Sequence, residues 1–441
     1  MALSGIQIYK MLPKTNCKEC GFPTCLAFAM KLAAKQVELS ACPYVSEESK
    51  AELAESSAPP IRLVSVKAGG LEVKAGNETV MFRHEKTFFN LPGLFLRVKS
   101  SMDADKIKKM VTEADAYKVN YVGMELIVDG FAVEADDETT FVDALKTVRS
   151  ATKRPLILIG NESAIKKAME ILQGENPLVC SANGTNWESM AEIANKYSTS
   201  LVVKGENFDD LAELTEKLKT KGCEDIVLDL GSGHLGNILA KSTQIRRLAL
   251  KKNMRSLGFP TITFANSTNG LDAIEAAQAI GKYSGFIVLD RFAPELFYPL
   301  LVLRQNIYTD PQKPIQVQPG IYEINSPNQD SPVLVTTNFS ITYFSVANEV
   351  EGSGMPVWLL VTDAEGMSVL TAWAAGKFDS ERIAKSVKEF GISDKVAKKR
   401  LVLPGHVAVL SGEVEEELPG WEIRVGPREA VDIPSFLKLV L

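Results

Sequence analysis

The spacing of hydrophobic residues changes along the chain, and the longest regular region lies between Pro92 and Arg304. In this region short apolar runs alternate with amphipathic stretches that have apolar residues at helical spacing. The runs are LFLRV, YVGMELIV, PLILIG, PLVCSA, SLVVKG, DIVLDLG, PTITFA and GFIVLD. Eight strand-and-helix units spaced roughly 20–35 residues apart are typical of a (β/α)8 TIM barrel. A doubly wound open sheet is the alternative, but eight near-equal units favour closure.

The segments on either side of this region have different patterns. Residues 61–90 contain LVSVKAG, LEVKAG and TVMFRHE, separated by Gly and Asn turns, which predicts a small antiparallel lead-in. After the Pro-rich connector TDPQKPIQVQPGIYEINSPNQDSP, the runs VLVTTNF, PVWLLVTD, RLVLPG, VAVLSGE and WEIRVGP alternate with helical stretches. This pattern predicts a small three-layer α/β domain of flavodoxin-like type, in which ligands bind at the carboxyl ends of the strands.

Changes in composition suggest three domains. The charged stretch AELAESSAPP ends the first, so we expect domains over residues 1–57, 58–310 (the barrel with its lead-in) and 311–441. Hydrophobic residues make up 45% of the 441 residues and charged residues 24%, which is typical of globular proteins. The net charge of −6 argues against a nucleic-acid-binding role. Because no membrane span or signal peptide is recognisable, we expect a cytoplasmic location.

Four of the six cysteines lie close together near the N-terminus. Cys17, Cys20, Cys25 and Cys42 have the spacing C-x2-C-x4-C-x16-C, and Pro43 follows the last of them. In a reducing compartment this pattern favours a metal over disulfides. Four thiolates followed by a proline suit a [4Fe–4S] cluster, whereas zinc sites usually have two C-x-x-C pairs. An iron–sulfur cluster is therefore the preferred interpretation, with zinc or unmetallated thiols as alternatives.

The barrel offers little candidate chemistry. The three histidines, His84, His234 and His406, are too dispersed in the sequence for a histidine-rich metal centre. Catalytic groups of barrel enzymes gather at the carboxyl ends of the strands. The residues expected at those ends are mostly small and neutral: Asn161, Ser181, Asn183, Gly231, Asn266 and Asp290. We therefore expect the barrel to be a scaffold or an interface.

Motifs at both ends of the chain resemble one protein family. The cysteine segment is LPKTNCKECGFPTCLAFAMKLA, and the C-terminal segments are TTNFSITYF, VTDAEGMSVLTAWAAGKF, LPGHVAVLSGEVEEELPGW and VGPREA. Together they resemble the large (gamma) subunit of the corrinoid/iron–sulfur protein of the acetyl-CoA (Wood–Ljungdahl) pathway. The resemblance spans essentially the whole chain. It implies a [4Fe–4S] domain, a barrel, a C-terminal corrinoid (cobamide) domain, and a small barrel subunit that completes a heterodimer.

The resemblance also implies a function, that of a methyl carrier within a one-carbon transferase system. Corrinoid Co(I) accepts a methyl group from methyl-tetrahydrofolate through a methyltransferase and passes it to acetyl-CoA synthase/CO dehydrogenase. The cluster returns Co(II) to Co(I) with electrons from a donor such as ferredoxin. The chain lacks the cobalt-ligating motif D-x-H-x-x-G, because Phe82, Ser232 and Pro404 stand two positions before its histidines. A corrinoid bound base-off, without a histidine ligand, favours Co(I).

The corrinoid contacts implied by the resemblance fall in three groups. Thr337, Asn338 and Thr342 would meet the macrocycle or its amides. Small residues would surround the nucleotide tail: Gly366, Met367, Ser368, Val369, Leu370, Thr371 and Ala372. Further hydrogen bonds would come from Pro404, Gly405, Ser411, Gly412, Gly426, Pro427, Glu429 and Ala430. For each glycine the alternative is a turn without a ligand.

Two other functions stay open at this point. One is a barrel methyltransferase that acts directly on a methyl-pterin and binds zinc through its cysteines. The other is an iron–sulfur electron-transfer subunit whose C-terminal domain is only an interaction module. The sequence does not distinguish a folate from an archaeal pterin as the methyl donor.

Overall fold

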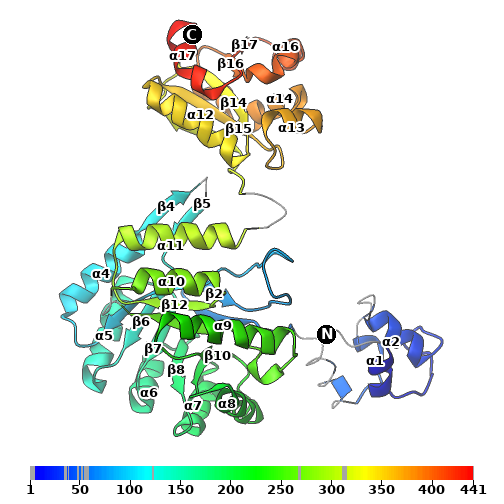
Figure 1. Ribbon diagram of the computed structural model, residues 1–441, viewed down its shortest axis with the longest axis vertical. Helices are drawn as coiled ribbons and strands as arrows, with labels where there is room; N and C mark the ends of the chain where they lie inside the picture. Colours follow the sequence, from blue (N-terminus) through cyan, green and yellow to red (C-terminus); the bar gives the residue numbers. More distant parts are fainter. Residues whose placement is uncertain are drawn as a thin grey trace. The chain divides into compact units, whose positions relative to one another are not determined.

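The computed structural model describes residues 5–33, 37, 39–46, 49–50, 53, 59–121, 124–266, 270–309 and 315–440 (Figure 1). The chain forms two compact units. The first comprises Met1–Met81, Asn90–Asp115 and Asp129–Phe292, and the second comprises Phe82–Phe89, Ala116–Val128 and Ala293–Leu441. The predicted domain boundaries at residues 57/58 and 310/311 lie outside the described residues. Within the described part, no helix has both the length and the apolar character needed to cross a bilayer.

The N-terminal segment contains two short helices, α1 (Gly5–Met11) and α2 (Cys25–Ala33), followed by the 3-10 turn η1 (Leu39–Ala41). The helices pack through Ile8, Phe28 and Ala29, which are buried in one apolar cluster. Gly5 allows this packing, because a Cβ there would collide with Met30. Such a small core depends on close contact between the two helices.

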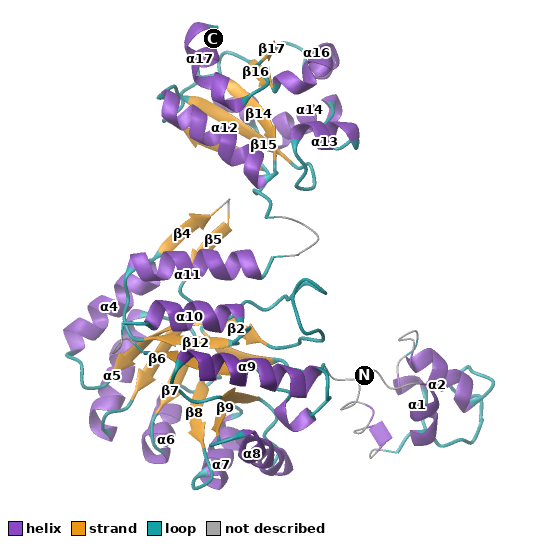
Figure 2. Ribbon diagram, viewed as in Figure 1, coloured by secondary structure: helices purple, strands orange, loops and turns teal. Residues whose placement is uncertain are grey.

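Eight parallel strands close into a barrel in the order β10-β11-β12-β3-β6-β7-β8-β9. They are β3 (Gly93–Lys99), β6 (Gly130–Glu134), β7 (Leu156–Ile159), β8 (Leu178–Ala182), β9 (Ser200–Lys204), β10 (Ile226–Asp229), β11 (Thr261–Ala265) and β12 (Phe286–Leu289). Helices of the same unit are α4 (Ala104–Ala116), α5 (Glu138–Ala151), α6 (Glu162–Ile171), α7 (Trp187–Tyr197), α8 (Phe208–Thr220), α9 (Leu235–Leu250) and α10 (Asp272–Gly281). The predicted barrel is confirmed (Figure 2).

An antiparallel hairpin closes the amino-terminal end of the barrel. Its strands β1 (Val64–Ala68) and β2 (Leu71–Ala75) bury Val64, Val66 and Ala75 in the same cluster as Phe95 and Phe286. The predicted lead-in is therefore confirmed for two strands. The third run, TVMFRHE, forms turns instead.

One of the eight predicted barrel strands was wrong. YVGMELIV belongs to an antiparallel hairpin of β4 (Lys118–Tyr121) and β5 (Met124–Ile127), and the barrel strand is the next run, β6. Both runs are short and apolar, so periodicity does not separate them. Burial separates them, because the first four residues of β6 are buried, whereas only Leu126 is buried in β5.

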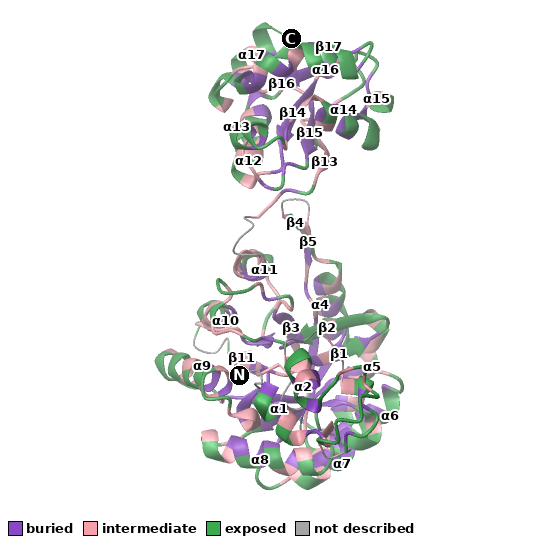
Figure 3. Ribbon diagram, turned by 90° about the vertical axis from the view of Figure 1, so that its right-hand side faces the viewer, coloured by how far each residue is buried: buried purple, intermediate pink, exposed green. Residues whose placement is uncertain are grey.

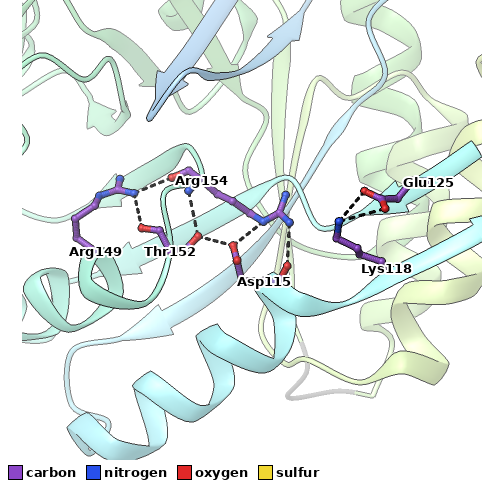
Figure 4. A network of polar contacts seen from close by, with 6 residues as sticks. All are labelled: Asp115, Lys118, Glu125, Arg149, Thr152 and Arg154. Carbon is purple, nitrogen blue, oxygen red and sulfur yellow. Dashed lines mark hydrogen bonds and ion pairs between the residues drawn. The ribbon is translucent and has the colours of Figure 1, made fainter.

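Polar side chains hold the barrel elements in place away from the strand carboxyl ends. Figure 4 shows that Arg154, just before β7, donates from Nε to Asp115 Oδ1 at the end of α4 over 2.8 Å. Thr152 donates to the same oxygen over 2.6 Å. In the second unit, Lys118 pairs with Glu125 across the β4–β5 hairpin at 3.0 Å.

The C-terminal sheet has five strands in the order β13-β15-β14-β16-β17. They are β13 (Gly320–Ile324), β14 (Val333–Thr337), β15 (Val357–Thr362), β16 (Arg400–Leu403) and β17 (Glu422–Val425). Strands β14 to β17 are parallel, and β13 joins the edge of β15 antiparallel. The sheet is therefore mixed. Strand β13 lies in a segment that the sequence analysis describes as a connector, so this strand was not expected.

Helices cover both faces of this sheet. Val333 and Val335 face one apolar cluster and Leu334 the other, as expected for buried strands. Strands β14 and β15 are buried along their length (Figure 3). The second unit also contains α11 (Pro294–Ile307), and its C-terminal part contains α12 (Ser340–Ser353), α13 (Val369–Ala374), α14 (Ser380–Glu389), α15 (Ile392–Lys395), η4 (Gly405–Leu410), α16 (Ser411–Glu417), η5 (Ala430–Asp432) and α17 (Ile433–Leu439). The run VAVLSGE, expected as a strand, is helical and forms part of η4 and α16.

Candidate functional site

Four free cysteines surround the small N-terminal core. Cys17 and Cys20 lie in the loop between α1 and α2, Cys25 is the first residue of α2, and Cys42 directly follows η1. Cys25 and Cys42 are buried in the apolar cluster, Cys20 packs against it, and Cys17 is exposed. The sequence motif thus becomes one loop-and-helix structure with three of its sulfurs near a common core.

The loop that carries Cys17 is fixed by Asn16. Its side-chain oxygen accepts a hydrogen bond from the Cys25 backbone N–H over 2.8 Å, and its own backbone N–H donates to Cys25 Sγ over 3.4 Å. Lys14, Asn16 and Lys18 have φ angles of 61°, 48° and 66°. Three non-glycine residues in the left-handed region give this loop an uncommon and defined path.

The donor set suits the predicted iron–sulfur cluster, since four cysteine thiolates are its usual ligands. Among the described residues, however, no group of three or more His, Cys, Asp and Glu side chains is arranged to hold a metal ion. The sulfurs therefore border the same core without converging on one point. Ligation by Cys17, Cys20, Cys25 and Cys42 stays a prediction.

The carboxyl ends of β14, β15, β16 and β17 share one edge of the C-terminal sheet, because these strands are parallel. The predicted corrinoid residues belong to the strand ends, loops and first helical turns that follow: 337–342, 366–372, 404–412 and 426–430. The fold therefore brings segments from nearly a hundred residues of sequence to one place, and their contacts with a corrinoid stay a prediction.

Asn338 directs its side chain into the protein. It is 1% exposed, and its Oδ1 accepts hydrogen bonds from the backbone N–H groups of Ala364 and Gly366 over 2.9 and 3.0 Å. Its Nδ2 donates to Gln316 Oε1 over 3.3 Å and Asp363 Oδ1 over 3.2 Å. Asn338 therefore fixes the turn that leads into the predicted nucleotide-tail segment.

Two buried hydroxyls on β14 have no hydrogen-bond partner within the described chain. Thr336 and Thr337 are 1% and 0% exposed, and the Oγ1 of each is unsatisfied. An unpaired buried hydroxyl is unfavourable. Thr337 is the last residue of the strand, so its hydroxyl fits an edge that receives a polar ligand, whereas Thr336 points to the opposite face of the sheet.

The glycines of this edge differ in what they contact. A Cβ on Gly405 would lie 2.6 Å from the Gly426 carbonyl oxygen, so this glycine allows the loops after β16 and β17 to approach each other. Gly366 has φ +74°, which favours glycine. A Cβ on Gly412, in the first turn of α16, would have nothing within 4 Å. The close approach at Gly405 and the backbone conformation at Gly366 thus explain why glycine stands at these two positions. At Gly412 the space beside the backbone is open.

Large apolar side chains are exposed around the same edge. They follow β14 (Ile341, 66% exposed), β15 (Trp373, 41%), β16 (Val409, 70%) and β17 (Val431, 68%). His406 is also here, with its Nε2 3.9 Å from Glu429 Oε1. These exposed apolar residues lie in the helical segments α12, α13, η4 and η5 that follow the four parallel strands, and such residues suit contact with a large ligand or a protein partner.

The barrel mouth is charged, so the expectation of a mostly neutral mouth was wrong. Arg97 on β3 pairs with Glu134 on β6 at 3.3 Å and with Asp290 after β12 at 3.0 Å. A cavity of about 260 Å³ beside them is also lined by Lys204 and Asp229. Burial raises the pKa of Asp229, although its carboxylate accepts a hydrogen bond from Gly231 N–H over 2.8 Å.

Sequence reasoning named Asp290 but missed Arg97, Lys204 and Asp229. These three lie inside the apolar runs LFLRV, SLVVKG and DIVLDLG, and not after them. A charged residue within a predicted buried strand could have indicated them, because charged side chains are rarely buried unless they are paired. Asn161, one of the expected strand-end groups, is instead the N-cap of α6, where its side chain accepts from Ala164 N–H over 2.9 Å.

Comparison with known proteins gives matches over the whole chain. The family model described as "CO dehydrogenase/acetyl-CoA synthase delta subunit" matches residues 64–437, and the one described as "Putative Fe-S cluster" matches residues 12–44, which include the four cysteines. The corrinoid/iron–sulfur protein large subunit of Moorella thermoacetica is 42% identical over 442 residues, 99% of each chain.

Archaeal proteins are also similar. The acetyl-CoA decarbonylase/synthase complex subunit gamma of Archaeoglobus fulgidus is 35% identical over 462 residues, which cover 99% of this chain and 98% of that one. The same subunit of Methanopyrus kandleri is 33% identical over 453 residues, with coverage of 99% and 97%.

Proposed function

The chain belongs to the family of corrinoid/iron–sulfur protein large subunits, and from this premise we propose that it carries methyl groups between two enzymes. The bound corrinoid supplies a reduced cobalt centre that accepts the methyl group of methyl-tetrahydrofolate, delivered by a methyltransferase, and yields it to acetyl-CoA synthase. As in other cofactor proteins, the chain's own residues bind and orient the group that reacts.

We assign one role in this function to each of the three predicted domains. Residues 1–57 hold a [4Fe–4S] cluster through Cys17, Cys20, Cys25 and Cys42, and this cluster provides the electron that restores oxidised cobalt. Residues 58–310 form the barrel scaffold. Residues 311–441 form a flavodoxin-like domain that holds the corrinoid at the carboxyl ends of its parallel strands.

The observation that carries the proposal is the surface at that edge of the C-terminal sheet. It combines exposed apolar side chains from the helical segments after four strands, a buried hydroxyl on Thr337 without a partner in the described chain, and open space at Gly412. A corrinoid offers an apolar macrocycle with an amide-bearing periphery, so this mixture of apolar and polar groups suits it. Asn338 acts by positioning, because its hydrogen bonds hold the turn before Gly366.

Partners follow from the same surface and from the relatives. The archaeal relatives are named as subunits of an acetyl-CoA decarbonylase/synthase complex. We assign this chain to a heterodimer with a small barrel subunit that covers the apolar residues around the corrinoid. Methyl donor and acceptor enzymes then have to reach the cobalt from the side left open.

The direct test is the absorbance and metal content of the full-length protein purified without oxygen. The proposal expects corrinoid and iron–sulfur bands together, with one cobalt and about four iron atoms per chain. Iron–sulfur bands alone would favour an electron-transfer subunit. Zinc without either chromophore would favour a barrel methyltransferase, and both outcomes would refute the proposal.

Electron paramagnetic resonance tests the base-off binding. The Co(II) form is expected to show no hyperfine splitting from an axial nitrogen. His406 lies at the proposed edge, so the His406→Ala variant is the control. Nitrogen splitting that disappears in this variant would show a histidine ligand, and splitting that persists would show the cobamide's own base on cobalt. Either result would refute base-off binding without a histidine.

A further inference from the structure

The loop that carries Cys17 is positively charged, although the chain as a whole has a net charge of −6. Residues 5–33 contain four lysines and one glutamate. The other five acidic residues before residue 58 all lie between 38 and 55. Positive charge is therefore concentrated in the part of the module that contains Cys17, Cys20 and Cys25.

Three of these lysines are exposed beside the outermost cysteine. Lys14 and Lys18 flank Cys17 in the loop, and Lys10 lies in the last turn of α1. Within the described part of the chain none of the three forms an ion pair, and Lys14 lies over the Tyr9 ring at 5.8 Å. Their charges are thus available to another molecule.

The glutamate in the same loop is already engaged. Glu19 Oε1 accepts a hydrogen bond from the Tyr44 hydroxyl over 2.8 Å, and this carboxylate raises the pKa of Tyr44. The loop itself has a defined path, because the backbone and side chain of Asn16 both bond to Cys25. The lysines therefore extend from a fixed base around an exposed sulfur.

We propose that Lys10, Lys14 and Lys18 form the docking surface for an acidic protein that donates single electrons to the cluster. This inference rests on the proposed function, since it requires a cluster at the cysteines. Electron transfer favours a short distance, and Cys17 is where the cluster would be nearest the solvent. Opposite charges steer such encounters and raise their rates by about ten- to a thousandfold at low salt.

Charge complementarity selects an acidic partner. A basic or neutral donor would gain nothing from three unpaired ammonium groups, whereas a carboxylate-rich donor would be attracted to this loop and repelled by the net negative charge of the whole chain. The step moves one electron from the reduced donor to the oxidised cluster, and no bond or proton is exchanged.

The experiment measures reduction of the cluster in the full-length holoprotein by a reduced acidic ferredoxin, followed by stopped-flow absorbance. The second-order rate constant is expected to fall steeply as ionic strength rises from about 0.02 to 0.5 M, where the Debye length shortens from roughly 20 to 4 Å. Lys14→Glu/Lys18→Glu should lower the rate at low salt by at least about tenfold and remove most of its salt dependence.

A matched control has the same change in charge on the barrel. Lys146 and Lys166 are exposed on α5 and α6, and Lys146→Glu/Lys166→Glu should keep more than about half of the original rate. Photoreduced deazariboflavin, a small reductant without net charge, provides a second reference, because charge steering does not act on it and it should reduce both variants and the unmodified protein at equal rates. If the Lys14→Glu/Lys18→Glu variant binds less iron, the single variant Lys10→Glu replaces it in the same measurement, because Lys10 is farther from the cysteines in the sequence.

The outcomes separate this proposal from the proposed function. Absence of a cluster in the unmodified protein would refute the function and the docking surface together. A normal cluster whose reduction by ferredoxin is equally fast in the loop variant and the barrel control would overturn the docking surface alone. A rate independent of salt in the unmodified protein would do the same.

Discussion

Replacing Asn338 by Ala should both destabilise the C-terminal domain and weaken corrinoid retention. Asn338 is 1% exposed, and its carboxamide oxygen is the acceptor for the N–H groups of Ala364 and Gly366. These two donors are buried, so water does not readily replace the lost acceptor. The turn they belong to precedes the segment proposed for the nucleotide tail.

The expected magnitude follows from the number of stranded groups. A buried donor left without a partner costs about 1–3 kcal/mol, so two such donors should lower the free energy of unfolding by about 2–6 kcal/mol. The bonds from Nδ2 to Gln316 and Asp363 are longer, at 3.3 and 3.2 Å, and we expect them to add little. A loss of this size is large against the usual stability of a domain.

Asn325 provides a matched control at the other end of the same sheet. Its Nδ2 donates to the carbonyls of Val350, Glu351 and Met355 over 3.0, 3.3 and 3.0 Å, and its φ is +57°. Asn325→Ala should therefore lower the free energy of unfolding by about 2–3 kcal/mol through lost hydrogen bonds and a strained backbone. It should not affect the carboxyl ends of the strands, where the corrinoid is proposed to bind.

Urea unfolding of the apoprotein gives the two stabilities, and cobalt content after gel filtration gives corrinoid retention. Asn338→Ala should retain at least about tenfold less cobalt than Asn325→Ala at similar stability, a difference of about 1.4 kcal/mol in binding. Equal cobalt in the two variants would refute the positioning role. A cost below about 1 kcal/mol for Asn338→Ala would show that the two N–H groups find other acceptors.

Four further substitutions test other parts of the structure. Cys20→Ala should remove or perturb the cluster but leave the corrinoid bound. Once the cobalt is reduced chemically, the variant should still accept methyl groups, whereas a protein electron donor should fail to reactivate it. Loss of methylation of the chemically reduced variant would contradict this expectation. Asp229→Asn should stabilise the barrel at neutral pH, since burial raises the pKa of Asp229. The unmodified chain then loses stability as pH rises from the unfolded pKa near 3.9 through the raised folded pKa, so the difference in unfolding midpoint should vanish at acidic pH. Gly412→Ala should stabilise α16 by up to about 1 kcal/mol while lowering cobalt retention, whereas Gly405→Ala, whose Cβ would lie 2.6 Å from the Gly426 oxygen, should lower the thermal midpoint by several degrees.

Hydrophobic periodicity predicts most of the fold because buried parallel strands are nearly continuous apolar runs. Seven of the eight barrel strands and four of the five C-terminal strands coincide with predicted runs. The exceptions have a common cause. β6 and the β4–β5 hairpin are adjacent short runs, and β13 is an edge strand with partly exposed residues in a Pro-rich segment, so local sequence does not determine which strand pairs with which.

The candidate sites differ in how far sequence predicts them. The four cysteines lie close together in the sequence, so their spacing alone predicts the N-terminal cysteine segment as a candidate site. The role of Asn338 was not predictable, because the turn it holds lies 26 and 28 residues further along the chain at Ala364 and Gly366. The charged barrel mouth also requires the closed barrel, since Arg97 meets Glu134 and Asp290 only when β3 lies between β6 and β12.

The barrel mouth and the C-terminal edge use polar groups in opposite ways, and this difference bears on where chemistry occurs. At the mouth, the Arg97 guanidinium lies between two carboxylates, so its charge is neutralised within the protein and joins three neighbouring strands. At the C-terminal edge, Asn338 holds a turn, and large apolar side chains are exposed around the same edge as His406 and Glu429. The exposed apolar side chains at the C-terminal edge suit the binding and orientation of a reactive group, which the proposed methyl-carrier function requires.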